Sequence, residues 1–427
     1  LSADQMGALS TSGAAALTTS QVKVLGADQI RALSTASVAA LTTGQVQALT
    51  TGQVAELTNT TVASLTTSQV AALSTGQVQV LADSVVTGLS TAQLTALTTA
   101  QVGALTASQV RALSTTEVAA LTTSQVTALT AAQVGALETA DMVAMSTDQV
   151  SALNTTQVAA LTAGMVTALS TAQVAALTTA QVSALAATSV AALGSNQLNA
   201  MTTSQVGALT AAQIKGLSSS TFASMGTTQV AALTTGQVAG LSVAVVGAMT
   251  STQVSAMTTS QVQSLTANQV KALAADKVAA MTTTQVAAFT SDQIKSLSAT
   301  QLQALTTSEV AAMGTAQVKA LTEAQIKSLT TDAVAAMTTA QVNALSAVQL
   351  KALSASQVTA LTSTNVAALA TTQISALSSS QVQALTTSAV GALSTSLVNA
   401  MTTSQVASLS AGQVKGMSTA QIQALEA

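Results

Sequence analysis

The chain has 427 residues, of which 48% are hydrophobic and 6% charged, with two Phe and no Pro, Cys, His, Trp or Tyr. Its formal net charge of −3 provides no field to attract nucleic acid or an anionic membrane surface. The absence of Cys and His excludes disulfides, ordinary nucleophile–base pairs and the usual zinc and haem ligands. We therefore expect no enzyme, no cofactor and no nucleic-acid partner.

A repeat of eight residues begins at Leu1 and keeps its register to Leu425, giving 53 complete octads and three further residues. The consensus Leu-Thr-Thr-x-Gln-Val-x-Ala occurs unaltered at Leu65–Ala72, and we number its positions as slots one to eight from the leucine. Slots one and six are always apolar, slot eight is Ala, Ser or Gly in 50 octads, slot two is Ser or Thr in 43, and slot five is Gln in 37. We predict one uninterrupted repeat domain over residues 1–427, an excerpt of a longer array.

An eight-residue period is incompatible with one continuous helix, because its apolar stripe would rotate by about 80° in each octad. Slots two and five instead carry the Ser/Thr-x-x-Gln spacing of a capping box, as in Thr66–Gln69. We therefore expect a short helix from slot three to the next leucine in every octad: residues 3–9, then 11–17, and so on to 419–425. No apolar run approaches the roughly 18 residues of a membrane span, so we expect no membrane insertion.

On such a helix, slots three, four and seven lie on one side, and slots one, five, six and eight lie on the other. We expect the first group to face solvent and the second to be buried. Gln at slot five is interpreted as a partly buried cap, consistent with replacements as different as Thr61, Val85, Glu117, Met165, Val245 and Leu397. Burying one Leu and one Val does not offset the entropy of ordering eight residues, so the helices must stack. The predicted fold is an all-α solenoid.

Charge placement supports the helices independently. Thirteen of the fourteen acids occupy slots two to five, and ten of the eleven bases occupy slot seven, with Glu56 and Lys277 as the exceptions. This order suits the helix dipole. The ten slot-seven bases are Lys23, Arg31, Arg111, Lys215, Lys271, Lys295, Lys319, Lys327, Lys351 and Lys415. The Thr pairs and the Gln column leave a β-solenoid with 16-residue coils as the alternative.

Few residues suggest a site. Asn59 and Asn154 begin N-glycosylation patterns, which chance alone produces in a Thr-rich chain. Glu138, Asp141 and Asp148 form the best acidic cluster for a metal, but we interpret them as exposed charges at helix starts. The Met residues of slot one are interpreted as core. We therefore assign no catalytic, cofactor-binding or metal residues.

The run LTTAQV, at Leu97–Val102 and again at Leu177–Val182, resembles the octapeptide tracts of very long secreted bacterial surface proteins. Some of those proteins are labelled adhesion or haem-utilisation proteins. The resemblance covers the whole chain and implies an extracellular or cell-surface location and a filamentous or stalk-like role. This chain has no His, Tyr or Cys to ligate haem.

The main hypothesis is a structural protein that forms or extends a filament, fibre or sheath by end-to-end and lateral self-association. The octads Leu1–Ala8 and Met417–Ala424 are as apolar as the others, so we expect the array to continue or its ends to stack on other copies. One alternative is a rigid spacer in a giant bacterial adhesin. Another is a regular Thr-rich surface that binds ice or a surface or matrix polysaccharide.

Overall fold

The computed structural model describes residues 1–425, which form two compact units, Leu1–Leu217 and the residues from Ser218 onward. Every octad forms one α-helix of four to six residues, 53 in all, and residues 1–425 contain no β-strand. The predicted all-α solenoid is confirmed, and the β-solenoid with 16-residue coils is wrong. Extended backbone is confined to slots one and two, which is too short a run to pair as a strand.

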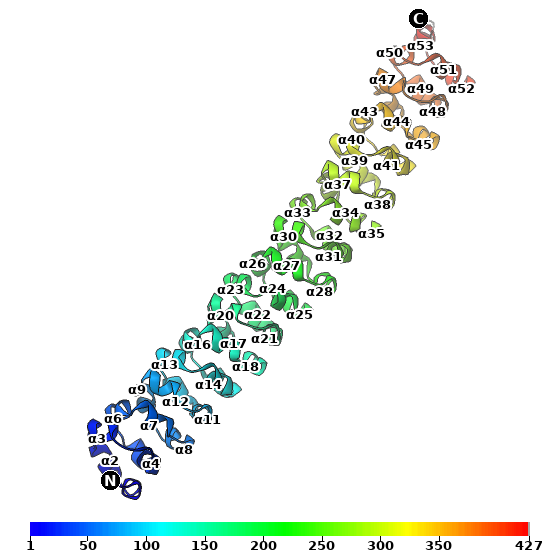
Figure 1. Cartoon of the computed structure of the whole chain (residues 1–427). Helices are drawn as coiled ribbons and strands as arrows, with labels where there is room; N and C mark the ends of the chain where they lie inside the picture. Colours follow the sequence, from blue (N-terminus) through cyan, green and yellow to red (C-terminus); the bar gives the residue numbers. More distant parts are fainter. Residues whose placement is uncertain (426–427) are drawn as a thin grey trace. The chain divides into compact units, whose positions relative to one another are not determined.

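The first unit contains 27 helices, which Figure 1 shows from blue to green. They are α1 (Ala3–Gly7), α2 (Thr11–Ala16), α3 (Thr19–Lys23), α4 (Ala27–Ala32), α5 (Thr35–Ala39), α6 (Thr43–Ala48), α7 (Thr51–Ala55), α8 (Asn59–Ala63), α9 (Thr67–Ala72), α10 (Thr75–Gln79), α11 (Asp83–Val86), α12 (Thr91–Ala96), α13 (Thr99–Ala104), α14 (Ala107–Ala112), α15 (Thr115–Ala120), α16 (Thr123–Ala128), α17 (Ala131–Ala136), α18 (Thr139–Ala144), α19 (Thr147–Ala152), α20 (Thr155–Ala159), α21 (Ala163–Ala168), α22 (Thr171–Ala176), α23 (Thr179–Ala184), α24 (Ala187–Ala191), α25 (Ser195–Ala200), α26 (Thr203–Ala208) and α27 (Ala211–Gly216).

The second unit contains the other 26 helices, described by the same slots. They are α28 (Ser219–Ala223), α29 (Thr227–Ala232), α30 (Thr235–Gly240), α31 (Val243–Ala248), α32 (Ser251–Ala256), α33 (Thr259–Ser264), α34 (Ala267–Ala272), α35 (Ala275–Val278), α36 (Thr283–Ala287), α37 (Ser291–Ser296), α38 (Ala299–Gln303), α39 (Thr307–Ala312), α40 (Thr315–Ala320), α41 (Glu323–Ser328), α42 (Thr331–Ala335), α43 (Thr339–Ala344), α44 (Ala347–Lys351), α45 (Ala355–Ala360), α46 (Ser363–Ala367), α47 (Thr371–Ile374), α48 (Ser379–Ala384), α49 (Thr387–Gly391), α50 (Thr395–Asn399), α51 (Thr403–Ala407), α52 (Ala411–Lys415) and α53 (Thr419–Ala424).

Each helix begins at slot three, as predicted, with the slot-two residue as its N-cap. The side chain of that residue accepts a hydrogen bond from the slot-five N–H in 44 of the 53 helices, for example Thr66 from Gln69 at 3.2 Å. The nine helices without such a side-chain bond have Gly26, Ala82, Glu138, Ala186, Gly194, Gly226, Ala274, Gly314 and Ala370 at this position.

The helix ends before the next leucine, one residue or more earlier than predicted. Leu73 has φ −57° and ψ 138°, and Ser74 after it has φ −71° and ψ 160°. Two extended residues therefore turn the chain between helices, and residues 1–425 contain no positive φ and no cis peptide. The absence of positive φ explains why glycine has no fixed slot in the repeat.

Each helix packs on the third helix along the chain in the same unit. In the first unit α3, α6 and α9 lie along one side, as α37, α40 and α43 do in the second (Figure 1). Slots one and six point inward, so that Leu65 is 5% and Val70 0% exposed. Burial of these two columns supplies most of the apolar driving force for stacking.

None of the helices within residues 1–425 combines the length and the apolar character needed to cross a membrane.

Candidate functional site

Gln at slot five makes the contact that joins successive turns. Gln69 Oε1 accepts from Thr66 N at 2.6 Å, which completes the capping box of α9. Its Nε2 donates to the carbonyl oxygens of Val38 at 3.0 Å and Leu41 at 2.6 Å, at the end of α5 and just beyond it. One side chain thus satisfies an N–H at the start of its own helix and carbonyls that end an earlier helix.

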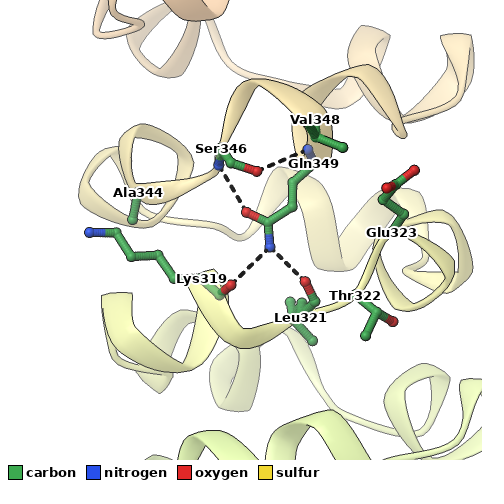
Figure 2. A pocket seen from close by; sticks show the side chains of 8 residues that line it. All are labelled: Lys319, Leu321, Thr322, Glu323, Ala344, Ser346, Val348 and Gln349. Carbon is green, nitrogen blue, oxygen red and sulfur yellow. Dashed lines mark hydrogen bonds between the residues drawn. The ribbon is translucent and has the colours of Figure 1, made fainter.

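The same arrangement recurs throughout both units. In Figure 2, Gln349 accepts from Ser346 N at 2.8 Å and donates to Lys319 O at 3.3 Å and Leu321 O at 2.7 Å. The acceptors always lie 28, 30 or 31 residues earlier, as for Gln133 and Gln269. The interpretation of Gln as a partly buried cap needs correction: Gln69 is only 2% exposed, because its amide lies between two turns.

Residues that replace Gln restore this bridge in part or not at all. Ser37 Oγ donates to Leu9 O at 2.9 Å, Asn365 Nδ2 to Met337 O at 3.1 Å, and Lys277 Nζ to Gly247 O at 3.2 Å. Glu117 keeps the cap, accepting from Ser114 N at 2.7 Å, but its buried Oε1 has no hydrogen-bond partner. A carboxylate oxygen cannot donate to carbonyls as Nε2 does.

Slot seven, which was predicted to face solvent, also contacts the next turn through its side chain. Ser183 Oγ lies 2.8 Å from Ala208 O, and Thr359 Oγ1 lies 2.9 Å from Ala384 O, each the slot-eight carbonyl 25 residues further on. A base at slot seven therefore lies near the C-terminus of its own helix and of the helix packed on it. This accounts for the ten bases at slot seven more fully than one helix dipole does.

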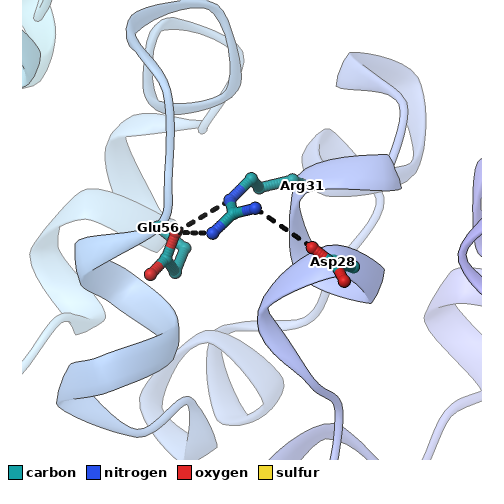
Figure 3. A network of polar contacts seen from close by, with 3 residues as sticks. All are labelled: Asp28, Arg31 and Glu56. Carbon is teal, nitrogen blue, oxygen red and sulfur yellow. Dashed lines mark hydrogen bonds and ion pairs between the residues drawn. The ribbon is translucent and has the colours of Figure 1, made fainter.

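Glu56, the slot-eight exception, uses this contact between turns. Figure 3 shows Arg31 donating to Glu56 Oε2 from Nε at 2.8 Å and Nη2 at 2.6 Å, and to Asp28 Oδ1 at 3.0 Å. The hydrogen bond that Arg31 donates to Glu56 and the negative charge of Glu56 raise the pKa of Arg31 above its ordinary value. This network is half-exposed and structural, with little effect on stability.

The acidic cluster is not brought together as a site. Asp141 is 2% exposed and accepts from Glu138 N at 2.8 Å, which caps α18, and Glu138 lies 4.0 Å from Arg111. Asp148, on α19, is exposed. Within residues 1–425 no three His, Cys, Asp or Glu residues are grouped to hold a metal. Burial raises the pKa of the Asp141 carboxyl, with a smaller rise from the charge of Glu138. The interpretation of the cluster as exposed charges is wrong for Asp141.

The two glycosylation patterns differ in their surroundings. Asn59 is exposed, but the Thr61 of its pattern is 5% exposed and its hydroxyl accepts from Thr58 N at 2.8 Å. Asn154 and Thr156 are both exposed, although Asn154 Oδ1 caps α20 by accepting from Gln157 N at 2.9 Å.

Shallow grooves repeat on the surface between turns. The groove in Figure 2 is lined by Lys319, Thr322, Glu323, Ser346 and Val348 together with the edge of the Gln bridge. Similar grooves occur beside Arg111 and beside Thr167, lined by corresponding slots. The lining contains hydroxyls, amides and single charges without an activated nucleophile.

Fold and surface together define an α-helical repeat solenoid whose recurring polar contact is structural. The family described as the ALTTAQ repeat matches residues 22–59, 86–115, 107–139, 134–171, 211–243, 287–323, 296–331, 310–347 and 334–371. These stretches cover more than half of the chain, which therefore belongs to the ALTTAQ repeat family. Comparison with curated proteins gives no match.

The capping role of the slot-five Gln was predictable from the sequence, whereas its bridge to the earlier turn was not. The spacing of slots two and five shows only the contact within an octad, whereas the partners of Nε2 lie about four octads earlier. Two signals pointed to a second role. Gln far outnumbers Glu at slot five, although both complete a capping box, and the slot lies on the apolar side.

Proposed function

We propose that this chain is a structural protein of the cell surface or extracellular matrix that forms or extends a filament, fibre or sheath. The observation that carries the proposal is the Gln bridge, because it joins each turn to the next by the same backbone acceptors. A contact of that kind repeats without limit, so that length and lateral packing become the useful properties of the molecule. The proposal assigns the chain no reaction and no cofactor.

The extracellular location is part of the proposal, and the composition is compatible with it. A surface rich in Thr and Ser, with few charges, suits side-by-side packing of copies. The absence of Cys is compatible with an oxidising environment, since the bridges and the Leu and Val columns hold the turns together without disulfides.

Mass photometry and sedimentation of the purified chain over a wide concentration range test the proposal. We expect species far above the 41.7 kDa of one chain, increasing with concentration. A single 41.7 kDa species at every concentration would overturn the filament proposal and favour a spacer that holds other domains apart. Binding of that single species to polysaccharide would favour the Thr-rich surface.

A further inference from the structure

The Gln bridge is absent at regular intervals along the chain. From Gly13 to Ala389, each octad without Gln at slot five follows the previous one by 24 or 32 residues, and Leu397 alone breaks the rule. The slot-five residues of these octads are Gly13, Ser37, Thr61, Val85, Glu117, Asp141, Met165, Ser189, Thr221, Val245, Lys277, Glu309, Ala333, Asn365, Ala389 and Leu397. Fourteen intervals span the 376 residues from Gly13 to Ala389, a mean of about 27 residues or 3.4 octads.

This interval is one turn of the solenoid. Each helix packs on the helix three octads away, and each Gln reaches carbonyls three to four octads earlier. The helices without Gln therefore stack on one another: α2, α5 and α8, and again α15, α18, α21 and α24, in the first unit. In the second unit α28 packs on α31, α39 on α42, and α46 on α49. We call the helices that lack Gln at slot five, including α11 and α35 but not α50, the non-Gln stripe of each unit. Figure 1 shows α8, α11, α18 and α21 along one edge of the first unit.

An isolated solenoid of equal octads gives every octad the same inner neighbours. Nothing inside it distinguishes one octad in each turn. The replacements also share no chemistry, since Gly13, Val85 and Lys277 have neither size, polarity nor charge in common. Within each unit they share a side of the solenoid, and contact with something outside the solenoid distinguishes one side from another.

The residue at the exposed slot seven also differs between octads that have Gln at slot five and octads that lack it. Lys, Arg or Gln occupies slot seven in 16 of the 37 octads that contain the bridging Gln, and in none of the 16 octads that lack it. There the residue is Ala, Gly, Thr, Val or Asn, as at Ala119, Val143 and Ala335. Curvature of the solenoid would also distinguish a side, but it would not require short side chains on the surface. Close contact with a neighbouring molecule requires short side chains on the surface that it covers.

Charge separates the stripe from the other helices as well. The stripe octads hold seven of the fourteen acids and one of the eleven bases. That base, Lys277, donates to Gly247 O, whereas the acids Glu138, Asp276 and Asp332 are exposed. The other ten bases lie at slot seven of Gln-containing octads. Two stripes facing each other would bring like charges together, whereas a stripe facing the basic helices pairs opposite charges.

We propose that the non-Gln stripe is the lateral contact surface for a second copy of this chain, which presents its basic helices, the Gln-containing helices with Lys or Arg at slot seven. A second copy has the same repeat and can match the stripe turn after turn. Contact between two different surfaces leaves both available on the outer copies, so that association stays open and widens into a sheet or bundle. This inference rests on the lateral packing in the proposed function and names the surface that performs it.

The test uses two matched triple variants. A119K, A335K and A367K add long cations to the stripe, whereas A159K, A239K and A287K add them to the same slot of Gln-containing octads. All six alanines are exposed, and slot seven already accepts ten bases, so both variants should keep the wild-type circular dichroism and melting temperature. Electron microscopy and sedimentation then measure assembly width and mass.

We expect the stripe variant to need a concentration at least tenfold higher than the wild type for side-by-side association. The control variant should associate at the same concentration as the wild type. Equal association by both variants would overturn the stripe and leave the filament proposal standing. A wild type that never associates would overturn both. A wild type that binds polysaccharide as single chains, with binding lost only in the stripe variant, would overturn the second copy as the occupant.

Discussion

At the scale of single residues, slot five determines how firmly each turn holds the next. A Gln there donates to carbonyls and accepts from an N–H, so that its amide is fully used in a site only a few per cent exposed. A buried polar atom without a partner costs about 1–3 kcal/mol. The unpaired Oε1 of Glu117 therefore marks a weak point in the first unit.

Glu117→Gln should stabilise the solenoid around α15 by about 1–3 kcal/mol, because Nε2 would reach the carbonyls of Val86 and Leu89 as other Gln residues do. Amide hydrogen exchange around α11 and α15 measures this locally, as suits a repeat array that need not unfold in one step. The matched control is Gln109→Glu on α14, which should lose the bonds to Val78 O and Leu81 O and exchange faster. Unchanged protection in both variants would contradict the bridge.

Asp141 makes stability depend on pH. Burial raises its pKa above the ordinary 3.8, so the folded protein binds this proton more tightly than the unfolded chain. The stabilisation from the bound proton is present below pH 3.8 and is lost as the pH rises through the folded-state pKa. Asp141→Asn, which can still cap Glu138 N, should therefore be more stable than wild type at neutral pH. The difference in melting temperature should close toward pH 3.8; a constant difference would show that burial of the charge is not its cause.

At the scale of one helix, capping determines where each element begins. Thr66→Val removes the hydroxyl that accepts from Gln69 N and should cost about 1 kcal/mol, with similar losses at Thr58 and Ser74. Thr67→Val is the control, because this neighbouring Thr is also exposed but occupies slot three of the same helix. Thermal melting of multiple-site variants measures the sum. A loss at slot three as large as at slot two would argue against capped helices.

The sequence was sufficient to predict these elements, because helix starts and apolar sides depend on contacts within one octad. The capping box of Thr66 and Gln69 and the inward Leu65 and Val70 were all predictable on that basis. Contacts between turns were not, since Leu and Val occupy the same slots in every octad and reveal no turn length. The bridge from Gln69 to Val38 and Leu41 required the structure. The turn length was nevertheless encoded in the octads that lack Gln, whose spacing gains meaning only once helices are seen to pack three octads apart.

For the molecule as a whole, side-by-side association should depend on whether the stripe helices of successive turns stay aligned. Deleting Leu121–Ala128 removes one octad, less than a third of a turn, and displaces the stripe after α15 from the stripe before it. Deleting Leu121–Ala144 removes three octads, almost a full turn, and leaves the stripe nearly in phase. Both deletions keep the octad register, so both chains should fold. Light scattering at matched concentration should show weaker side-by-side association for the shorter deletion; equal association would contradict a surface that needs consecutive turns.

Copies of this solenoid are proposed to assemble side by side, the non-Gln stripe of one copy against the basic helices of the next. Cryo-electron microscopy of the wild-type chain at assembling concentrations tests it most directly, because helices are resolved together with their neighbours. We expect bundles or sheets in which helices such as α18 and α21 of the first unit, or α28 and α31 of the second, face the basic helices of an adjacent copy. Solenoids that remain separate at every concentration, or that touch through Gln-containing helices alone, would contradict it.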